Sequence, residues 1–508
     1  MSWILFVFYL AVFVFIIKKS KFFDDNLLPK KILILIFITK ISIGVSLNFI
    51  YKNYYDDQNN SDIYKYFNDS KHIHQSLYNN PIHFLQLLTG YNDEDQDLKC
   101  YVDSTMNWKY QSNFYSDLTN TNNNTLSNHR TITKFNSIVR IFSFGYINIH
   151  VIFMCFLSFI GCFLIYKTYL PFIPNSNFKL FIIVVFLLPC ILIWSSGILK
   201  EGLIVFSFGI FIYSLIKISK KQFEWRYILG LIYSIFLLFI TKYYIIIILI
   251  PIAFIFLIFS HSKRLILFKY LFSILVFSIL FFNNNSINTY VINNLNNKRN
   301  EQERISYGGH YYVQFDQNNF KRLVRFKDDV SDYETPYFNK GNNRIDSSLL
   351  MIKPGLEYQI VSNGLYSDFF ITDSLFSCYF LDAYKKAGSY YDLPIISDKS
   401  TLEFLKSSLI SLFNVFTKPF QISEGSIMLR LASLENLGLI LLIIFLFIKR
   451  RIKIKNLNLL IFNLLFTIQL YIIIGFTTPV IGGLFRYKML GLLLFVISLL
   501  MIFDKRKI

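Results

Sequence analysis

Charged residues are scarce in this chain. Of its 508 residues 16% are charged, whereas a typical soluble protein has roughly 25%. The deficit falls in long apolar runs, which excludes an ordinary soluble domain over most of the length and indicates lipid as the solvent. Acidic residues are the scarcer kind, with 32 Asp and Glu against 51 Lys and Arg, so the formal net charge is +19.

That excess of positive charge fits two classes of protein. One is a nucleic-acid binder, and the other is a membrane protein whose cytoplasmic edges are basic. The Lys and Arg residues mostly bracket the apolar runs. We therefore favour the membrane protein and expect no nucleic-acid partner.

Several chemical motifs are missing as well. The chain contains no HExxH, no GxSxG, no phosphate-binding loop and no dinucleotide fingerprint. Its five cysteines show no metal-binding spacing, and His72 and His74, two residues apart, would not face one ligand on a helix. We expect no metal and no cofactor. Cys100 and Cys378 lie in polar loops, where a disulfide between them is possible.

The long apolar runs predict an all-α integral membrane protein of about eleven transmembrane helices, because about 20 apolar residues cross a hydrocarbon core of roughly 30 Å. The predicted spans are 3–18, 31–51, 146–168, 178–195, 199–216, 226–241, 243–260, 265–282, 432–448, 456–477 and 484–503. The stretch 226–260 would be about 52 Å long as one helix, so we expect two helices that turn at Thr241–Lys242–Tyr243–Tyr244.

The basic clusters give the orientation. With eleven spans they all fall on one side, at residues 18–31, 167–179, 217–226, 261–264, 449–455 and 504–507. Clusters of Lys and Arg mark the cytoplasmic side. The first apolar run is preceded by no basic residue and followed by Lys18 and Lys19, which is typical of an uncleaved anchor. We therefore expect the N-terminus outside and the C-terminus in the cytoplasm.

The same parity places two large loops outside. It divides the chain into an N-terminal hairpin (1–51), a first extracytoplasmic loop (52–138), a six-helix block (139–282), a second extracytoplasmic loop (283–431) and a C-terminal three-helix block (432–508). Within the second loop, residues 402–413 place their apolar side chains on one helical face. This pattern predicts an interfacial helix along the outer leaflet.

Ionisable residues on the outer side are the informative signal, because one buried in a span costs about 2.5–3.5 kcal/mol. Three connections at the outer face carry such groups, at 194–202, 241–243 and 482–488, and Glu435 belongs to the same layer. The basic members are Lys200, Lys242, Arg486 and Lys488. One interpretation is that these side chains only reach toward outer head groups.

The other interpretation is an anion site. Lys and Arg gathered at one membrane depth suit a phosphate or pyrophosphate, and a guanidinium can bind two oxygens at once. Neighbouring glycines would let backbone N–H groups approach the same anion. Three such connections carrying positive charge on the outer face favour this second interpretation.

The first loop adds acid close to the membrane. Asp62 and Tyr66 are four residues apart and share one face of a helix. A carboxylate at this position is a candidate general base toward a sugar hydroxyl. The alternative is an ordinary solvated loop acid.

The order of these motifs resembles bacterial polysaccharide polymerases of the O-antigen polymerase type, including those of capsule and exopolysaccharide loci. The resemblance rests on residues 61–67, on Pro189 with 194–201, on 242–244 with Pro251, on 418–420 with 433–436, and on 485–488. It implies a glycosyltransferase-type polymerase in the bacterial cytoplasmic membrane. A glycan on undecaprenyl pyrophosphate would be moved onto the next lipid-linked repeat unit, without a metal.

The resemblance also implies roles. Asp62, Glu201 and Arg486 would be catalytic, and the substrate-binding residues would be Tyr66, Lys200, Lys242, Glu435, Tyr487 and Lys488. Membrane lipids, a flippase and a chain-length regulator would be partners. One departure concerns the basic residues: the family often carries several arginines near the chemistry, whereas Arg486 is the only guanidinium in this layer.

Two other classes stay open. A C-type glycosyltransferase that uses a polyprenyl-phosphate sugar also has many spans and an acid early in its first external loop. In that class the acid normally follows the first span, and here Asp62 follows the second. A transporter or flippase ranks third. Transporters of this size tend to show two similar halves and short loops, and this chain shows neither.

Overall fold

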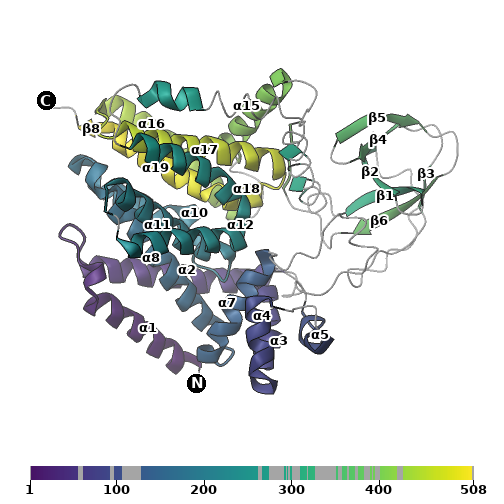
Figure 1. The fold of residues 1–508 in the computed structure, drawn as a ribbon, viewed down its shortest axis with the longest axis horizontal. Helices are drawn as coiled ribbons and strands as arrows, with labels where there is room; N and C mark the ends of the chain where they lie inside the picture. Colours follow the sequence, from purple (N-terminus) through teal and green to yellow (C-terminus); the bar gives the residue numbers. More distant parts are fainter. Residues whose placement is uncertain are drawn as a thin grey trace.

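The computed structural model describes most of the chain. Described are residues 2–54, 61–91, 96–105, 128–222, 224–260, 266–273, 389–391, 393–394, 401–419 and 427–505, with the backbone of six strands between 309 and 382 and a few single positions between 291 and 302. Figure 1 shows a bundle of helices and, beside it, a small sheet.

Helices form nearly all of the bundle. In chain order they are α1 (Ser2–Lys19), α2 (Lys30–Tyr54), α3 (Asp62–Asn79), α4 (Pro81–Thr89), α5 (Gln96–Val102), α7 (Asn128–Ser143), α8 (Ile147–Tyr169), α9 (Phe178–Leu187), α10 (Pro189–Trp194), α11 (Lys200–Ser219), α12 (Trp225–Phe259), α15 (Thr401–Thr417), α16 (Ile427–Lys449), α17 (Leu457–Thr477), α18 (Ile481–Tyr487) and α19 (Met489–Ile502). Among the described residues, eight helical segments are long and apolar enough to cross a membrane, or nine with the bent pair α18 and α19. The chain is a multi-pass helical membrane protein.

Two of the predicted spans are broken helices. The span 178–195 consists of α9 and α10, separated at Leu188, whose ψ of 124° is not helical. Pro189 starts the second piece because it has no N–H to contribute to a helix interior. The span 484–503 consists of α18 and α19, which meet at an angle of 54°. The predicted span 265–282 lies partly outside the described residues, and its part 266–273 is helical.

The stretch 226–260 forms the single element α12, interrupted at Lys242 by extended backbone (φ −150°, ψ 86°). Tyr227 packs against Tyr213 near the end of α11, with ring centroids 6.0 Å apart, whereas Lys242 reaches the first turn of α11. Beyond Lys242, the carbonyl of Phe256 accepts a hydrogen bond of 3.2 Å from Asn458, at the start of α17.

One end of the bundle collects the basic connections, and we call it the basic end (residues 18–31, 167–179, 217–227, 450–458 and 503–505). Lys167 donates to the Phe22 carbonyl, and Lys220 lies 5.3 Å from the centre of the Phe172 ring. Strands β7 (Arg450–Ile452) and β8 (Phe503–Lys505) pair antiparallel there. These contacts place connections far apart in sequence at one level, as the charge asymmetry predicted.

The opposite end, which we call the site end, carries the elements of the first predicted loop. The side chain of Ser61 caps α3 by accepting from the Tyr64 N–H at 3.3 Å, and Asn80 with Pro81 starts α4. In Figure 1, α3, α4 and α5 lie on the side of the bundle that faces the sheet. These helices of the first predicted loop therefore lie on the same side of the bundle as the sheet.

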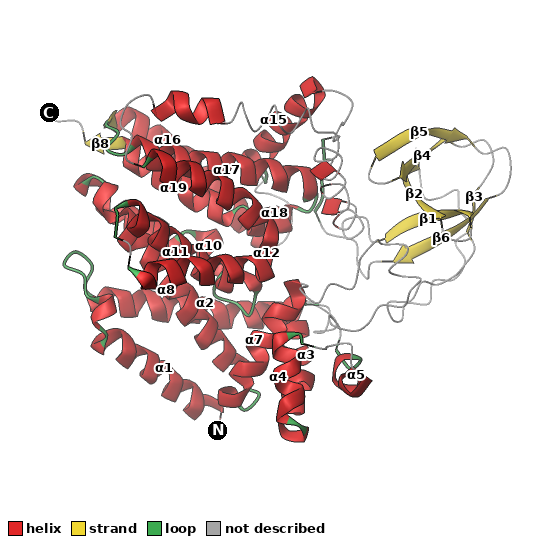
Figure 2. Ribbon diagram, viewed as in Figure 1, coloured by secondary structure: helices red, strands yellow, loops and turns green. Residues whose placement is uncertain are grey.

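The second predicted loop contains a sheet that the sequence analysis did not predict. Its strands are β1 (Gly309–Asp316), β2 (Asn319–Phe326), β3 (Leu350–Ile352), β4 (Glu357–Ser362), β5 (Leu365–Ile371) and β6 (Phe376–Asp382). They are ordered β3-β6-β1-β2-β4-β5, and every neighbouring pair is antiparallel (Figure 2). Strands such as β1 and β5 are rich in Tyr, Phe, Val and Ile, which favour the pleated backbone. The membrane part is helical as expected, and the second predicted loop adds a sheet that the expectation did not include.

The predicted interfacial helix 402–413 lies within α15. Ser411 faces α17, where a Cβ on Gly475 would come within 2.6 Å of the Ser411 carbonyl oxygen. Leu402, Leu409 and Phe413 stay exposed. An apolar face left open beside a membrane helix is suited to lipid.

Close helix packing behind the site depends on small residues. A Cβ on Gly161 of α8 would lie 2.3 Å from the Val205 carbonyl oxygen, and one on Gly209 of α11 would lie 2.3 Å from the Gly161 carbonyl oxygen. Such contacts let two helix backbones touch where lipid supplies little driving force for association. They fix α11, whose first turn carries Lys200 and Glu201.

Candidate functional site

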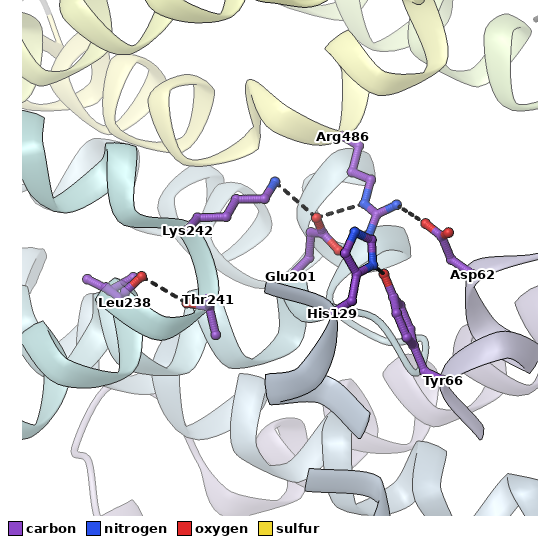
Figure 3. A network of polar contacts seen from close by, with 8 residues as sticks. All are labelled: Asp62, Tyr66, His129, Glu201, Leu238, Thr241, Lys242 and Arg486. Carbon is purple, nitrogen blue, oxygen red and sulfur yellow. Dashed lines mark hydrogen bonds and ion pairs between the residues drawn. The ribbon is translucent and has the colours of Figure 1, made fainter. Parts of the chain in front are cut away.

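Four charged side chains from four helices meet at the site end (Figure 3). Glu201 of α11 lies between two cations. Its Oε1 accepts from Lys242 Nζ of α12 at 3.2 Å and lies 2.7 Å from Arg486 Nε of α18. The second contact is an ion pair without hydrogen-bond alignment, since Arg486 Nε has no hydrogen-bond partner. Arg486 also donates from Nη1 to Asp62 Oδ2 of α3 at 3.0 Å.

The cluster is graded from buried to open. The Glu201 side chain has 0% of its surface exposed, Lys242 has 9%, Arg486 has 13% and Asp62 has 43%. Asp62 therefore lies at the entrance and Glu201 at the floor. Salt and water therefore screen the buried ion pairs of Glu201 little, and they screen the ion pair between Asp62 and Arg486 more.

Lys200 adds a further positive charge to this cluster. It is 7% exposed, and its Nζ lies 5.8 Å from the centre of the Tyr66 ring. Among the described residues it makes no ion pair within 4.0 Å. Lys200 thus lies beside the pairs of Glu201 and Asp62 without joining them, among the residues that the structure describes. A buried ammonium without a paired carboxylate is costly, so this arrangement is poised to bind an anion.

The turn between α10 and α11 presents Lys200 and Glu201. Ser158 of α8 donates to the Ser195 carbonyl at 2.8 Å, and Lys40 of α2 donates to Ser195 Oγ at 2.6 Å. These bonds supply partners for polar groups that the end of α10 leaves unpaired. The turn is thus held from two neighbouring helices.

The glycines beside these charges allow neighbouring helices to pack closely. A Cβ on Gly197 would lie 2.8 Å from Leu47 Cδ2, and one on Gly202 would lie 2.3 Å from Met154 Sδ. Both glycines permit close packing against α2 and α8. The prediction that their backbone N–H groups approach an anion stays a prediction. Gly482 has no atom within 4 Å of such a Cβ.

The site is recessed below the ends of the neighbouring helices at the site end. A Cβ on Gly44 of α2 would lie 2.5 Å from the Ser196 carbonyl oxygen. Four residues further along α2, Asn48 contacts Asn148, which follows the start of α8, at 3.4 Å. Four residues of helix span about 6 Å. The turn therefore lies about one helical turn beneath the start of α8.

Helix α3 is anchored so that Asp62 and Tyr66 face the cluster, as their spacing predicted. Arg140 of α7 donates from Nε to Ser70 Oγ at 2.7 Å, and its guanidinium lies 4.2 Å from the centre of the Phe67 ring. This guanidinium at the site end was not expected. Burial raises the pKa of Asp62, but Arg486 outweighs that effect and lowers it to about 2. Asp62 is therefore ionised and a weaker base than a free carboxylate.

His129, in the first turns of α7, is a site residue that the sequence analysis missed. Its Nδ1 lies 2.9 Å from the Tyr66 hydroxyl, and Figure 3 shows both beside Arg486. The positive charge of Lys200, together with burial, holds the pKa of His129 well below its ordinary value. The imidazole is neutral in the free site. The available signal was the amphipathic helical pattern of 128–143, most of which lies within the first predicted loop (52–138).

No family model, curated protein or solved structure matches this chain. The function of the chain is therefore inferred from the geometry of this site.

Two predicted members lie apart from the cluster. Glu435 accepts from the Cys190 N–H at 3.2 Å and so supplies a partner for an amide that the break at Pro189 leaves free. Lys488 donates to Asn436 Oδ1 at 2.9 Å and to the Lys418 carbonyl at 3.3 Å. Neither forms an ion pair with the four-residue cluster. Their contacts position helices away from the cluster, and their assignment to substrate binding stays a prediction.

Tyr487 does join the cluster. Lys242 Nζ lies 3.7 Å from the centre of its ring, a cation–π contact that helps hold the ammonium beside Glu201. Cys100 is an exposed free thiol in this structure and forms no disulfide. The side chain of Cys378 lies outside the described residues.

Proposed function

We propose that this protein polymerises oligosaccharide repeat units linked to polyprenyl pyrophosphate at the outer face of the bacterial cytoplasmic membrane. The observation that carries the proposal is Lys200, a buried ammonium beside Glu201 and Asp62 that makes no ion pair within 4.0 Å among the described residues. A dianionic diphosphate would supply the missing negative charge. The site lies about one helical turn beneath the neighbouring helix ends, and this depth suits a head group joined to a lipid.

The proposal includes an eleven-span topology. Both ends of α12 contact elements near the basic end, at Tyr213 and Asn458, whereas Lys242 between them reaches Glu201 at the site end. We infer that the chain reverses direction at Lys242. That reversal keeps the 449–455 cluster on the cytoplasmic side, with the N-terminus outside and the C-terminus in the cytoplasm.

A labelling experiment tests this topology. In a cysteine-free background, a single cysteine replacing exposed Tyr91 at the site end should react with an impermeant thiol reagent in intact cells whose outer membrane, if present, is permeabilised. Cysteines replacing Trp225, Ser260 or Lys453 should not react, and all three should react after lysis. A cysteine at 260 that reacts in intact cells, with silence at 225, means that α12 crosses the membrane once and that the parity is wrong.

Deletion of the gene tests the reaction. We expect cells that lack long polymer and accumulate lipid-linked glycan one repeat unit long, because flipped units would no longer be joined. Mass spectrometry of extracted polyprenyl-linked glycans measures both. Polymer of normal length that lacks a single side-chain sugar would instead identify a C-type glycosyltransferase. Unchanged glycans of every kind would contradict both enzymes and favour transport.

A further inference from the structure

The pair Lys200 and His129 lies inside the site but outside its ion-pair network. Tyr66 joins the two residues: Lys200 Nζ lies 5.8 Å from its ring centre, and its hydroxyl lies 2.9 Å from His129 Nδ1. The three come from α11, α3 and α7. Neither Lys200 nor His129 takes part in the ion pairs of Glu201 and Asp62.

The charges around His129 explain its state. Positive groups face it from α11 (Lys200), from α18 (Arg486) and from Lys298, and one carboxylate faces it from α3 (Asp62). Lys200 exerts the largest effect, ahead of burial, and Asp62 opposes it. Any anion that neutralises Lys200 therefore removes the largest effect that lowers the pKa of His129.

We propose that a bound diphosphate neutralises the Lys200 ammonium and thereby makes His129 the group that takes the proton of the acceptor hydroxyl. This inference rests on the proposed function and names the base for it. Asp62 and Glu201 are less suited to that role, because Arg486 contacts both carboxylates. The site would thus acquire its base only when a donor is bound.

In the proposed transfer the anomeric carbon exchanges one oxygen for another. The acceptor hydroxyl gives its proton to His129 Nε2, and its oxygen forms a bond to the anomeric carbon of the donor sugar. The bond from that carbon to the diphosphate oxygen breaks, and its electron pair stays on the oxygen, beside Lys200. Departure of the lipid diphosphate restores the original charge around His129, which then releases its proton to solvent.

The tautomer of His129 is part of the inference. Nε2 can accept a proton only if Nδ1 carries the hydrogen and donates it to the Tyr66 oxygen. Burial raises the pKa of Tyr66 well above its ordinary value, so its oxygen stays a neutral hydroxyl. Tyr66→Phe should therefore lose this orientation and lower kcat while KM changes little.

Histidine-selective NMR tests the coupling. The full chain, in nanodiscs with ¹³C-labelled histidine, has seven histidines, and the resonance that disappears in His129→Gln identifies His129. Without an anion, its titration midpoint should lie well below that of His72. Excess inorganic pyrophosphate should raise the midpoint by about one to two pH units. In Lys200→Met the midpoint should already be raised and should no longer respond to pyrophosphate.

Matched controls use exposed or remote groups on α3. Lys71→Ala should leave the response of His129 unchanged, and the resonance of His72 should not move when pyrophosphate is added. If Lys200→Met does not insert, Lys200→Gln serves the same purpose. If the ³¹P signal of pyrophosphate broadens on binding but the titration of His129 does not change, the proposed link between the anion and His129 is wrong. Absence of any binding overturns the anion subsite as well.

This readout is independent of the reaction in cells. A deletion strain that accumulates single repeat units, together with a His129 midpoint that ignores pyrophosphate, would leave the polymerase intact and refute the role of His129. The opposite pair of results would refute the polymerase and retain a diphosphate site. In a reconstituted assay, His129→Gln should lower kcat about 100-fold with KM little changed, whereas Lys200→Met should raise KM.

Discussion

Arg486→Ala should reduce polymer by at least about 100-fold, the loss seen when one preorganised group that stabilises transition-state charge is removed. The guanidinium contacts Asp62 at 3.0 Å and Glu201 at 2.7 Å, so it holds α3 and α11 in register around the site. Polymer length and amount on gels, normalised to inserted protein, provide the measurement. Arg486→Lys should recover activity only in part, because one ammonium cannot reach two separated carboxylates as a planar fork does.

The matched control is Arg430→Ala. Arg430 is exposed near the start of α16, at the same end of the bundle, and should tolerate the change. Full activity of Arg486→Ala at normal abundance would contradict an anion site built around this residue. The basic side chains would then be interpreted as groups that only reach toward outer head groups.

Glu201→Ala is expected to have the largest effect on stability. The change leaves Lys242 and Arg486 facing one another without the fully buried carboxylate that contacts both. Removing one partner of a buried pair costs about 3–5 kcal/mol, which is a large part of the stability of a folded protein. We expect little inserted protein and a much lower thermal midpoint in detergent.

A second variant separates charge balance from packing. Glu201→Gln combined with Lys242→Met restores the net charge of the cluster, and we expect it to recover much of the thermal midpoint but no polymer synthesis. The control is Glu224→Gln, since Glu224 pairs with Arg226 at an exposed position and such pairs contribute about 0–1 kcal/mol. Equal midpoints for Glu201→Ala and Glu224→Gln would show that the buried pair does not stabilise the fold.

The sequence predicted the membrane depth of the site residues better than it predicted which of their side chains contact one another. Hydropathy and charge asymmetry place Glu201, Lys242 and Arg486 at one level of the membrane, and the structure brings them together. Glu435 and Lys488 share that level but contact Cys190 and Asn436 instead. Depth along the membrane normal follows from position in a span. The direction in which a side chain points around its helix depends on neighbours that only the folded chain defines.

The sequence also could not identify features that depend on contacts between distant parts of the chain. His129 stands alone in an Asn- and Thr-rich stretch, and only its contact with Tyr66 links it to the site. The sheet follows from strand pairings such as β1 with β6, which are separated by more than 60 residues. Local patterns do not report pairings at that separation.

The interruption of α12 at Lys242 has a consequence for the surrounding bilayer. The first half of α12, from Trp225 to Thr241, is about 25 Å long, which is less than the roughly 30 Å of a typical hydrocarbon core. A hydrophobic segment that is too short draws the lipid surface inward. In the proposed topology we expect a dimple in the outer leaflet above the site, so that water and sugar would reach Lys242 while the lipid chain of the proposed substrate would stay in the membrane. The short hairpin would shape the membrane as well as the protein.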